Sequence, residues 1–550
     1  MKYDAIVVGS GISGGWAAKE LCEKGLKVLL IERGPEVKHK EDYTTAMQEA
    51  WQLPHHGKMD LQTRADYWAH VRTGYTANAE HRHFFTRDVD HPYLEAQPFT
   101  WVRGYQTGGR SLMWGRQSYR WPDLDFEANA REGVGIDWPI RYRDLAPWYA
   151  HVERFAGISG QAEGWSSLPD GVFQPAMEMN CAEREIKKRI QGKYPITVGR
   201  IAHLTRPTEE QKSLGRTSCQ YRNRCMRGWP YGAYFSTQSA TLPAAQRTGN
   251  LTVVHQQVVF QVLFDDAKGK ATGVKALHQD TGEESEYHAR LLFLNASAIN
   301  TAWIMMQSTS RTHPNGLGNA SGQLGRNIMD HHKSRVVSGT LEGLEDLYYF
   351  GKRPNGIYIP RFVNRDFLRG FGYQGGASRP PLGAGEEIGQ ALKDRYTRLG
   401  PWQFSLTGFG EILPNEKNHF RLSPEKDKLG LPLVEFDAAL GENEYKMKDC
   451  MLEEATAMLE MAGLKNIYSY ESQKSVPGIS IHEMGTARMG HTPETSVLNR
   501  HNQVWNAPNV FVTDGAALTS SSNVNPSLTY MALTARAVDF AVNEMKKANL

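Results

Sequence analysis

The sequence predicts an α/β protein in which one domain is assembled from distant parts of the chain and a second domain is inserted between those parts. Three observations support this class. Residues 3–34 carry a compact strand–helix–strand pattern, residues 250–310 and 505–515 carry further apolar strands, and long insertions separate these segments. Strands that alternate with helices are typical of a parallel sheet. One domain with a discontinuous sheet explains this order better than a row of separate domains.

The composition of the chain is that of an ordinary globular protein. Its 550 residues are 40% hydrophobic and 22% charged, which provides enough apolar sequence for a large core. The net charge is +3 with both signs interspersed, so no nucleic-acid or acidic-membrane partner is expected. Five cysteines, an odd number, argue against a disulfide framework.

The compartment is predicted from the absence of targeting signals. No apolar run is long enough to span a bilayer. A strand begins at Tyr3, so we expect no cleavable signal before the fold. The sequence therefore predicts a cytoplasmic protein, or a periplasmic one if a partner that carries a signal exports it.

The first strand–helix–strand pattern contains a glycine-rich turn. Residues 3–8 form an apolar strand, residues 13–25 have helical spacing, and residues 27–32 form the next parallel strand. The turn consists of Gly9, Ser10, Gly11, Ile12, Ser13 and Gly14. Its glycines permit a tight turn, close approach of a pyrophosphate, and close packing of helix on strand, while the helix start favours phosphate. Glu32, followed by Arg33, stands where a carboxylate binds ribose hydroxyls, which predicts a dinucleotide site rather than a packing turn but does not choose between FAD and NAD.

The remaining elements follow in order along the chain. Residues 40–100 have little strand pattern, and we expect a helical and loop excursion there that acts as a lid or subunit contact. Helices are predicted at 136–156, around 301–308, at 441–463 and from Ser527 onward. Strands are predicted as antiparallel runs within 250–279, as a buried strand at 289–297, repeatedly across 335–440, and at 510–515.

Several separated motifs extend from one end of the chain to the other. They lie at residues 103–115 (RGYQTGGRSLMWG), 250–263, 325–331 (GRNIMDH), 482–490 (HEMGTARMG), 512–515 (VTDG) and 523–527 (NVNPS). Together with the glycine-rich turn, this set resembles the glucose–methanol–choline (GMC) oxidoreductase family. Within that family it is most similar to sugar oxidoreductases such as pyranose 2-oxidase and the bacterial glucoside 3-dehydrogenase and gluconate dehydrogenase large subunits.

The resemblance implies a cofactor and a division into domains. An FAD-binding Rossmann-like domain would comprise residues 1–40, 95–120, 195–333 and 475–550, and a substrate-binding domain built on an antiparallel sheet would comprise 121–194 and 334–474, leaving 41–94 as the lid or oligomerisation excursion. Besides the glycine-rich turn, Glu32 and Arg33, the implied FAD-binding residues are Gly108, Gly109, Arg110, Ser111, Trp114, Gly115, Val259, Asp514, Gly515, Asn525, Pro526 and Ser527.

The resemblance also implies the catalytic residues. Alcohol oxidation removes a proton from the hydroxyl and a hydride from the carbon, and a positioned neutral imidazole is a usual base near pH 7. His482 matches the base of the family, and Asn525 matches a second position whose amide can donate to the forming alkoxide. Glu411 is either an orienting carboxylate or an ordinary strand-end residue.

Two positions depart from patterns found in this family. In pyranose 2-oxidase a flavin-loop His bonds covalently to FAD, whereas this chain has Met113 there, so we expect non-covalent FAD. Some bacterial relatives hold an iron–sulfur cluster with a group of cysteines, whereas this chain retains only Cys219 and Cys225, and Trp229 stands where another cysteine is expected. Because clusters need three or four thiolates, we expect no metal, with a two-cysteine metal site or a labile disulfide as the alternative.

The predicted function is FAD-dependent oxidation of a secondary hydroxyl of a sugar or glycoside, with C3 of a glycoside favoured. The alternatives are C2 oxidation of an aldose or gluconate, an oxygen-using pyranose oxidase, and a non-redox flavoprotein in which FAD is structural. The sequence does not name the electron acceptor, and a small partner subunit is a further expectation from the resemblance.

Overall fold

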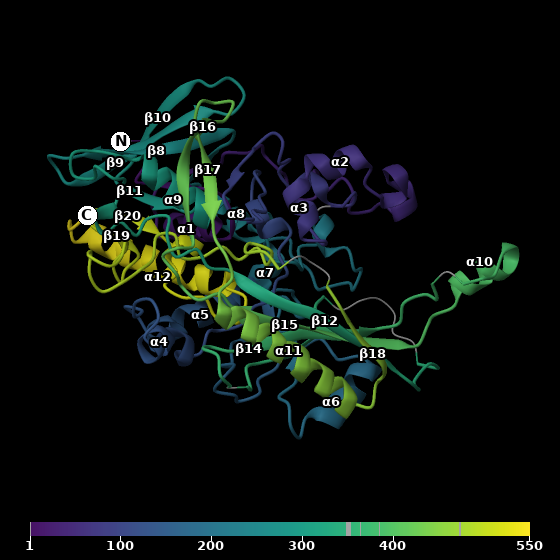
Figure 1. Ribbon diagram of the computed structural model, residues 1–550. Coiled ribbons are helices and arrows are strands. Elements are labelled where there is room, and N and C mark those ends of the chain that lie inside the picture. Colours follow the sequence, from purple (N-terminus) through teal and green to yellow (C-terminus); the bar gives the residue numbers. More distant parts are fainter. Residues whose placement is uncertain (1, 77, 348–353, 364, 384, 472–474) are drawn as a thin grey trace.

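Two six-stranded sheets dominate the molecule (Figure 1). The computed structural model describes residues 2–76, 78–347, 354–363, 365–383, 385–471 and 475–550. The first sheet gathers strands from both ends and the middle of the chain, whereas the second takes nearly all its strands from residues 331–470. This arrangement confirms the predicted α/β class with an antiparallel sheet. The exact domain boundaries stay a prediction, and positions 77, 348–353, 364, 384 and 472–474 within them lie outside the described residues.

The first sheet is mostly parallel. Its strands, in spatial order, are β19 (Gln503–Val504), β20 (Ala507–Val512), β11 (Leu291–Leu294), β1 (Ala5–Val8), β2 (Val28–Ile31) and β7 (Leu251–Val254). Every neighbouring pair is parallel except β19 with β20. The strands β1, β2 and β11 are fully buried, which explains why their sequences are continuously apolar instead of alternating.

One sequence-based expectation for this sheet is wrong. We expected residues 250–266 to pair only with antiparallel strands, but β7 lies parallel to β2, with Val28 opposite Leu251. The antiparallel run begins after a break at Gln256, whose φ is +57°. This residue turns the chain from one sheet into the next, and alternating hydrophobic residues on both sides of it concealed the change of partner.

Different layers cover the two faces of the first sheet. Helices α1 (Ile12–Glu23), α8 (Leu242–Arg247) and α12 (Ser527–Lys546) pack on one face. A three-stranded antiparallel sheet of β8 (Gln257–Asp265), β9 (Lys270–His278) and β10 (Glu284–His288), with α9 (Ala298–Gln307), covers the other. The predicted helices around 301–308 and from Ser527 are confirmed, and the glycine-rich turn lies between β1 and α1.

The second sheet is antiparallel throughout. Its spatial order is β18 (Lys465–Tyr470), β12 (His331–Leu341), β15 (Trp402–Glu411), β14 (Phe371–Ser378), β13 (Ile357–Ile359) and β6 (Thr197–Val198). Helices α6 (Cys181–Ile190) and α11 (Glu442–Met461) pack on one face of it. The predicted helix at 441–463 is therefore confirmed within two residues of each end.

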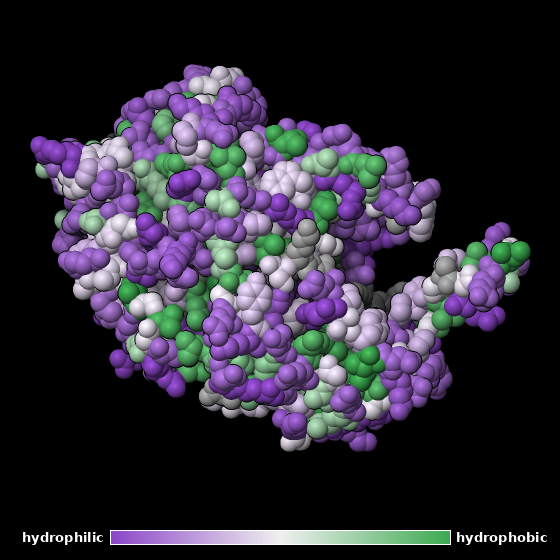
Figure 2. Space-filling view, viewed as in Figure 1, coloured by the Kyte–Doolittle hydropathy of each residue, from purple (hydrophilic) through white to green (hydrophobic). Residues whose placement is uncertain are grey.

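The other elements connect or extend these layers. They are α2 (Leu61–Asp66), α3 (Trp68–Arg72), β3 (Leu94–Glu95), α4 (Asp123–Glu132), α5 (Tyr142–Ala156), β4 (Ile158–Ser159), β5 (Phe173–Gln174), α7 (Glu209–Ser213), α10 (Gly389–Thr397), β16 (His419–Lys426) and β17 (Pro432–Asp437). Residues 40–100 form the short helices and loops expected. Helix α10 projects from the rest of the molecule and contains no buried residue (Figures 1 and 2). No helix among the described residues is both long and apolar enough to cross a membrane.

Candidate active site

A cavity of about 540 Å³ is lined by residues of both sheets. One end lies at the carboxyl ends of β1 and β2, beside Glu32 and Arg33. The other end reaches β12, β14 and β15 of the second sheet and includes His482 and Asn525. Ligands of α/β sheets typically bind at the carboxyl ends of parallel strands, so the position of the cavity matches the predicted dinucleotide site.

The glycine-rich turn forms one wall of the cavity. Gly9 has a φ of +89°, and a Cβ on Gly14 would lie 1.8 Å from the Gly9 carbonyl oxygen, so both positions require glycine. A Cβ on Gly11 would meet no atom within 4 Å. The Glu32 carboxylate accepts hydrogen bonds from the Ser10 backbone N–H at 3.0 Å and its hydroxyl at 2.5 Å. All the predicted residues here line the cavity except Gly14, which lies beneath it.

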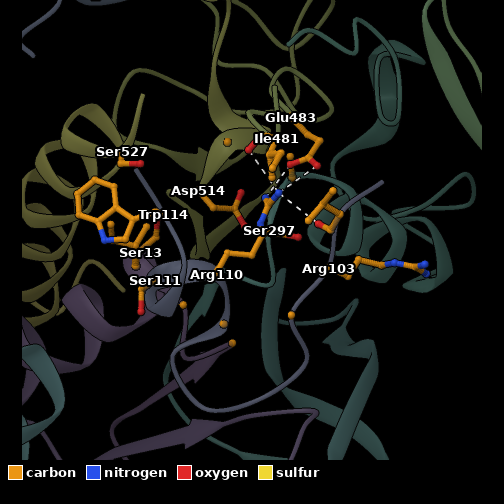
Figure 3. Close-up of a pocket in the computed structure, with 18 of the residues that line it drawn as sticks. Ser13, Arg103, Arg110, Ser111, Trp114, Ser297, Ile481, Glu483, Asp514 and Ser527 are labelled. Carbon is orange, nitrogen blue, oxygen red and sulfur yellow. Dashed lines mark hydrogen bonds and ion pairs between the residues drawn. The ribbon is translucent and has the colours of Figure 1, made fainter. Parts of the chain in front are cut away.

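The predicted flavin loop crosses the middle of the cavity. Gly109, Arg110, Ser111, Trp114 and Gly115 line it, whereas Gly108 packs against Gln238 instead. The Arg110 guanidinium makes two hydrogen bonds with the Glu483 carboxylate, at 3.1 and 2.6 Å (Figure 3). The same guanidinium donates to the Ile481 carbonyl at 3.3 Å. Arg110 therefore joins the flavin loop to the segment that carries His482.

The C-terminal motif residues close the cavity from a third side. Asp514, Gly515 and Ser527 line the cavity, whereas Pro526 does not. The Asp514 carboxylate accepts hydrogen bonds from the Thr301 hydroxyl at 2.6 Å and the Ala516 N–H at 3.0 Å. Burial raises the pKa of Asp514 to about 6 in spite of these bonds. The Asp514 side chain is held in one orientation by these bonds and lies beside Arg110 and Ser297 (Figure 3).

The residues of the cavity fit FAD. Open backbone at Gly11 beside the start of α1 suits a pyrophosphate, and the Glu32 carboxylate at the end of β2 suits ribose hydroxyls. Val259 and Arg33 line the same end, where the Arg33 guanidinium stacks 3.9 Å from the Tyr105 ring centroid. The cavity continues from there past Trp114 to His482, so a long dinucleotide with an aromatic headgroup matches its lining.

His482 and Asn525 lie together at the far end of the cavity. Asn525 Nδ2 is 3.4 Å from His482 Nε2. Burial, together with the neighbouring His331, Lys333 and Arg110, holds the pKa of His482 well below its ordinary value. The imidazole is therefore neutral at pH 7 and able to accept a proton.

His331 and Asp330 support His482 from behind. His331 Nδ1 lies 2.9 Å from His482 Nδ1, and the two rings meet edge to face. The Asp330 carboxylate accepts hydrogen bonds from the backbone N–H groups of His482 and Ser480, each at 3.0 Å. Asp330, His331 and His482 are the one group of three potential metal ligands among the described residues. These hydrogen bonds account for the cluster, and the absence of a metal stays a prediction.

A row of amide side chains reaches Asn525 from the other side. Gln374 Nε2 donates to Asn525 Oδ1 at 2.8 Å, and Gln117 Nε2 donates to Gln374 Oε1 at 3.2 Å. The buried Tyr119 hydroxyl donates to Gln117 Oε1 at 2.5 Å. Gln117 and Gln374 also line the cavity, so they are available to a substrate.

A lysine from the second sheet enters the same end of the cavity. Lys333 lies opposite Phe409 in the β12–β15 register, and both residues line the cavity. Lys333 Nζ is 3.3 Å from the Tyr75 hydroxyl and 4.4 Å from the Tyr75 ring centroid. Burial lowers the pKa of Lys333 to about 8. Among the described residues no carboxylate lies within ion-pair distance of this ammonium, which leaves donors free for a ligand.

Several other residues lie away from the cavity. Glu411 pairs with Arg361 at 3.1 Å within a buried ion network and does not reach His482. Trp101, Tyr119 and Trp121 are core residues that do not line the cavity. Cys219 and Cys225 are both free thiols.

Among the residues that sequence reasoning missed are four polar lining residues, Tyr75, Gln117, Lys333 and Gln374. It also missed the contact of His331 with His482. The motif at 325–331 offered a signal for His331, because it places an imidazole directly after the buried Asp330. The four lining residues carry no comparable local signal.

Comparisons with known proteins identify the family of the chain. Family models described as GMC oxidoreductase match residues 3–333 and 414–534. The 2-methyl-1,2-propanediol dehydrogenase of Mycolicibacterium austroafricanum is 28% identical, over 98% of this chain and 94% of its own length. The fructose dehydrogenase large subunit of Gluconobacter japonicus is 25% identical, over 100% of this chain and 99% of its own length.

A solved structure gives independent support for the fold. Pyridoxine 4-oxidase from Mesorbium loti superposes with a TM-score of 0.63 at 16% identity, covering 98% of this chain and 99% of that one. The family models cover more than half of the chain, and the lining of the cavity fits FAD. The chain belongs to the GMC oxidoreductase family and is an FAD-dependent enzyme that oxidises alcohol groups.

Proposed function

We propose that this enzyme oxidises a secondary hydroxyl of a sugar or glycoside, with C3 of a glycoside as the favoured position. The observation that carries the proposal is the lining of the cavity around His482 and Asn525. Gln117, Gln374 and Lys333 offer polar groups there, beside aromatic surfaces. A polyhydroxylated ring needs several directional hydrogen bonds as well as apolar contact. Similarity to a fructose dehydrogenase large subunit supports the same substrate class.

His482 acts as the general base in this proposal. Its pKa lies well below the ordinary value, chiefly because of burial, so the imidazole is neutral at pH 7. The ring nitrogen that serves as the base in this proposal is Nε2. That atom faces Asn525 and the cavity, where it receives the proton of the substrate hydroxyl. A positioned base of this kind contributes a rate enhancement of roughly 10²–10⁴-fold.

Asn525 orients the substrate oxygen. Its Oδ1 is engaged by Gln374, so its Nδ2 is the group available to donate to the oxygen as negative charge develops. Asn525 cannot accept the proton through that group, which leaves His482 as the base. When bound, FAD supplies the acceptor for the hydride that leaves the carbon.

The test measures anaerobic reduction of the bound flavin through the loss of its absorbance. The panel of substrates contains sugars, glycosides, gluconate and 2-methyl-1,2-propanediol. Reduction by glycosides, with a 3-keto product located by NMR, is the expected result. A 2-keto product would support the alternative of C2 oxidation, and rapid reoxidation by oxygen with peroxide release would support an oxidase. Reduction by the aliphatic diol alone would refute a sugar substrate.

A His482→Gln variant is the matched control, because Gln retains polarity but is not a base. We expect it to keep its FAD and to lose substrate-dependent reduction by about 10²–10⁴-fold. Reduction at the parent rate would refute the role of His482. Absence of reduction by every substrate in the parent enzyme would favour a structural flavin.

A further inference from the structure

We infer that His331 and Gln374 are positioning residues that hold His482 in one tautomer, with its proton on Nδ1 and its Nε2 lone pair facing the cavity. The inference rests on the proposed role of His482 as base. It assigns functions to two residues on strands β12 and β14 of the antiparallel sheet, which are separated by β15 and contact opposite sides of the catalytic pair.

A hydrogen-bond chain that runs in one direction ends at Asn525 and orients its amide. The Tyr119 hydroxyl donates to Gln117 Oε1, Gln117 Nε2 donates to Gln374 Oε1, and Gln374 Nε2 donates to Asn525 Oδ1. Each amide has one accepting and one donating end. Once one amide in the row is oriented, each following amide is oriented as well. In the orientation that the structure gives this row, Asn525 presents its NH₂ group, and not its carbonyl oxygen, to His482.

The orientation of the Asn525 amide determines which nitrogen of His482 carries the proton. Asn525 Nδ2 has only hydrogens to offer, so His482 Nε2, 3.4 Å away, must be the unprotonated nitrogen. The single proton of the neutral imidazole then resides on Nδ1, which lies 2.9 Å from His331 Nδ1. His331 Nδ1 accepts that hydrogen bond. The bond made by one ring nitrogen thus decides the state of the other.

His331 can serve as this acceptor because it is neutral. Burial lowers the pKa of His331 to about 4, against an opposing effect of the Ser522 and Val524 backbone. A neutral acceptor orients His482 without the strong attraction that a carboxylate would exert on a positive imidazolium. Other charged groups near the pair are Lys333 and Arg110, which lower the pKa of His482, and Asp330, whose oxygens accept backbone N–H groups.

Two substitutions of His331 separate an accepting role from mere packing. His331→Leu removes the acceptor, and we expect flavin reduction to slow by about 10- to 100-fold, by analogy with the loss when the orienting partner of a metal-bound imidazole is removed. His331→Asn places a carbonyl oxygen near the position of Nδ1, and most of the rate should return. FAD content and apparent substrate affinity should stay at parent values in both variants.

A substitution of Gln374 inverts the chain. Gln374→Glu has the same shape and still accepts from Gln117, but it cannot donate to Asn525 Oδ1. Asn525 should then turn over and present its oxygen to His482, which favours the tautomer with the proton on Nε2. We expect loss of flavin reduction together with a change of tautomer.

The tautomer is read by ¹⁵N NMR of histidine-labelled enzyme, with the His482 signals assigned by their absence in His482→Gln. The parent should show a protonated Nδ1 and an unprotonated Nε2, and Gln374→Glu should show the reverse. The inference would be overturned if His331→Leu reduced flavin at the parent rate, or if His331→Leu and His331→Asn lost equal activity. An unchanged tautomer in Gln374→Glu would also overturn it. EDTA should leave all rates unchanged, and sensitivity to EDTA would overturn the proton-sharing role in favour of a metal.

The readouts distinguish this inference from the proposed function. If no sugar reduces the flavin, the proposed function fails, whereas the NMR comparison still tests the tautomer. If sugars reduce the flavin but His482 carries its proton on Nε2 in the parent, only the positioning roles fail.

Discussion

Gly11 offers a substitution that should abolish FAD binding without affecting the folding of the chain. Gly11 has a φ of −62° and a ψ of −166°, an extended conformation that valine adopts readily. Its Cβ would meet no protein atom within 4 Å, because that direction opens into the cavity. Gly11→Val should therefore leave the stability of the FAD-free protein within about 0.5 kcal/mol of the parent.

The magnitude of the loss in FAD affinity follows from the hydrogen bonds that the new side chain would displace. Hydrogen bonds to a charged group contribute about 1.5–3 kcal/mol each. If the valine separates the backbone at the helix start from two such bonds to the pyrophosphate, the loss is about 3–6 kcal/mol. This corresponds to an increase of roughly 10²–10⁴-fold in the FAD dissociation constant.

The assay titrates the FAD-free variant with FAD and measures binding by flavin fluorescence and absorbance. Thermal unfolding of the FAD-free parent and variant compares their stability. Gly14→Ala is the matched control, because its Cβ would lie 1.8 Å from the Gly9 carbonyl oxygen and must displace backbone. We expect that control to lose about 1–3 kcal/mol of folding stability. Parent affinity for FAD in Gly11→Val would refute the placement of the pyrophosphate.

Three further predictions concern the charges around His482. Because its pKa lies well below the ordinary value, the neutral base is present throughout pH 6.5–7.5, below the pKa of about 8 of Lys333. The rate of flavin reduction should therefore be flat over that range, and a fall in rate as the pH drops through 7 would contradict the neutral base. Lys333→Met removes a positive charge that lowers the pKa of His482, so the acidic limb of that profile should move to higher pH, and an unmoved limb would count against the contact. Arg110→Met leaves the Glu483 side chain, which is 1% exposed, without its partner, and should lower the free energy of unfolding by about 3–5 kcal/mol in denaturant unfolding. The double variant Arg110→Met/Glu483→Leu should recover that stability, and equal losses in the single and double variants would refute pairing as the cause.

Local sequence patterns predicted the parts of this protein that depend on backbone geometry. The glycine-rich turn, the buried strands and the helix that begins at Ser527 each carry their own signal within a few residues. His482 and Asn525 were predicted only through motifs similar to those of a known family, and the structure places them 3.4 Å apart although 43 positions separate them. Their catalytic roles stay proposals.

The lining contributed by the antiparallel sheet could not be predicted in the same way. The side chains of Lys333, Gln374 and Phe409 reach one cavity because three strands pair in a particular register. A shift of one residue would turn each side chain to the opposite face. A β-bulge between Lys333 and Val336 further changes the register within β12. Such a register is determined by tertiary packing, which alternating sequence patterns do not specify.

The two sheets therefore differ in how many residue types their cavity-lining positions can accept. The parallel sheet lines the predicted FAD site largely with glycine backbone and one carboxylate, so we expect few substitutions there to be compatible with FAD binding. The antiparallel sheet presents exchangeable side chains, including Lys333 and Phe409, to the same cavity. Substrate choice can change on that second wall without altering the groups that bind FAD. Gln374 on this wall and His331 behind His482 are exceptions, because the inferred tautomer of His482 depends on both. Substitutions of either residue should affect every substrate alike.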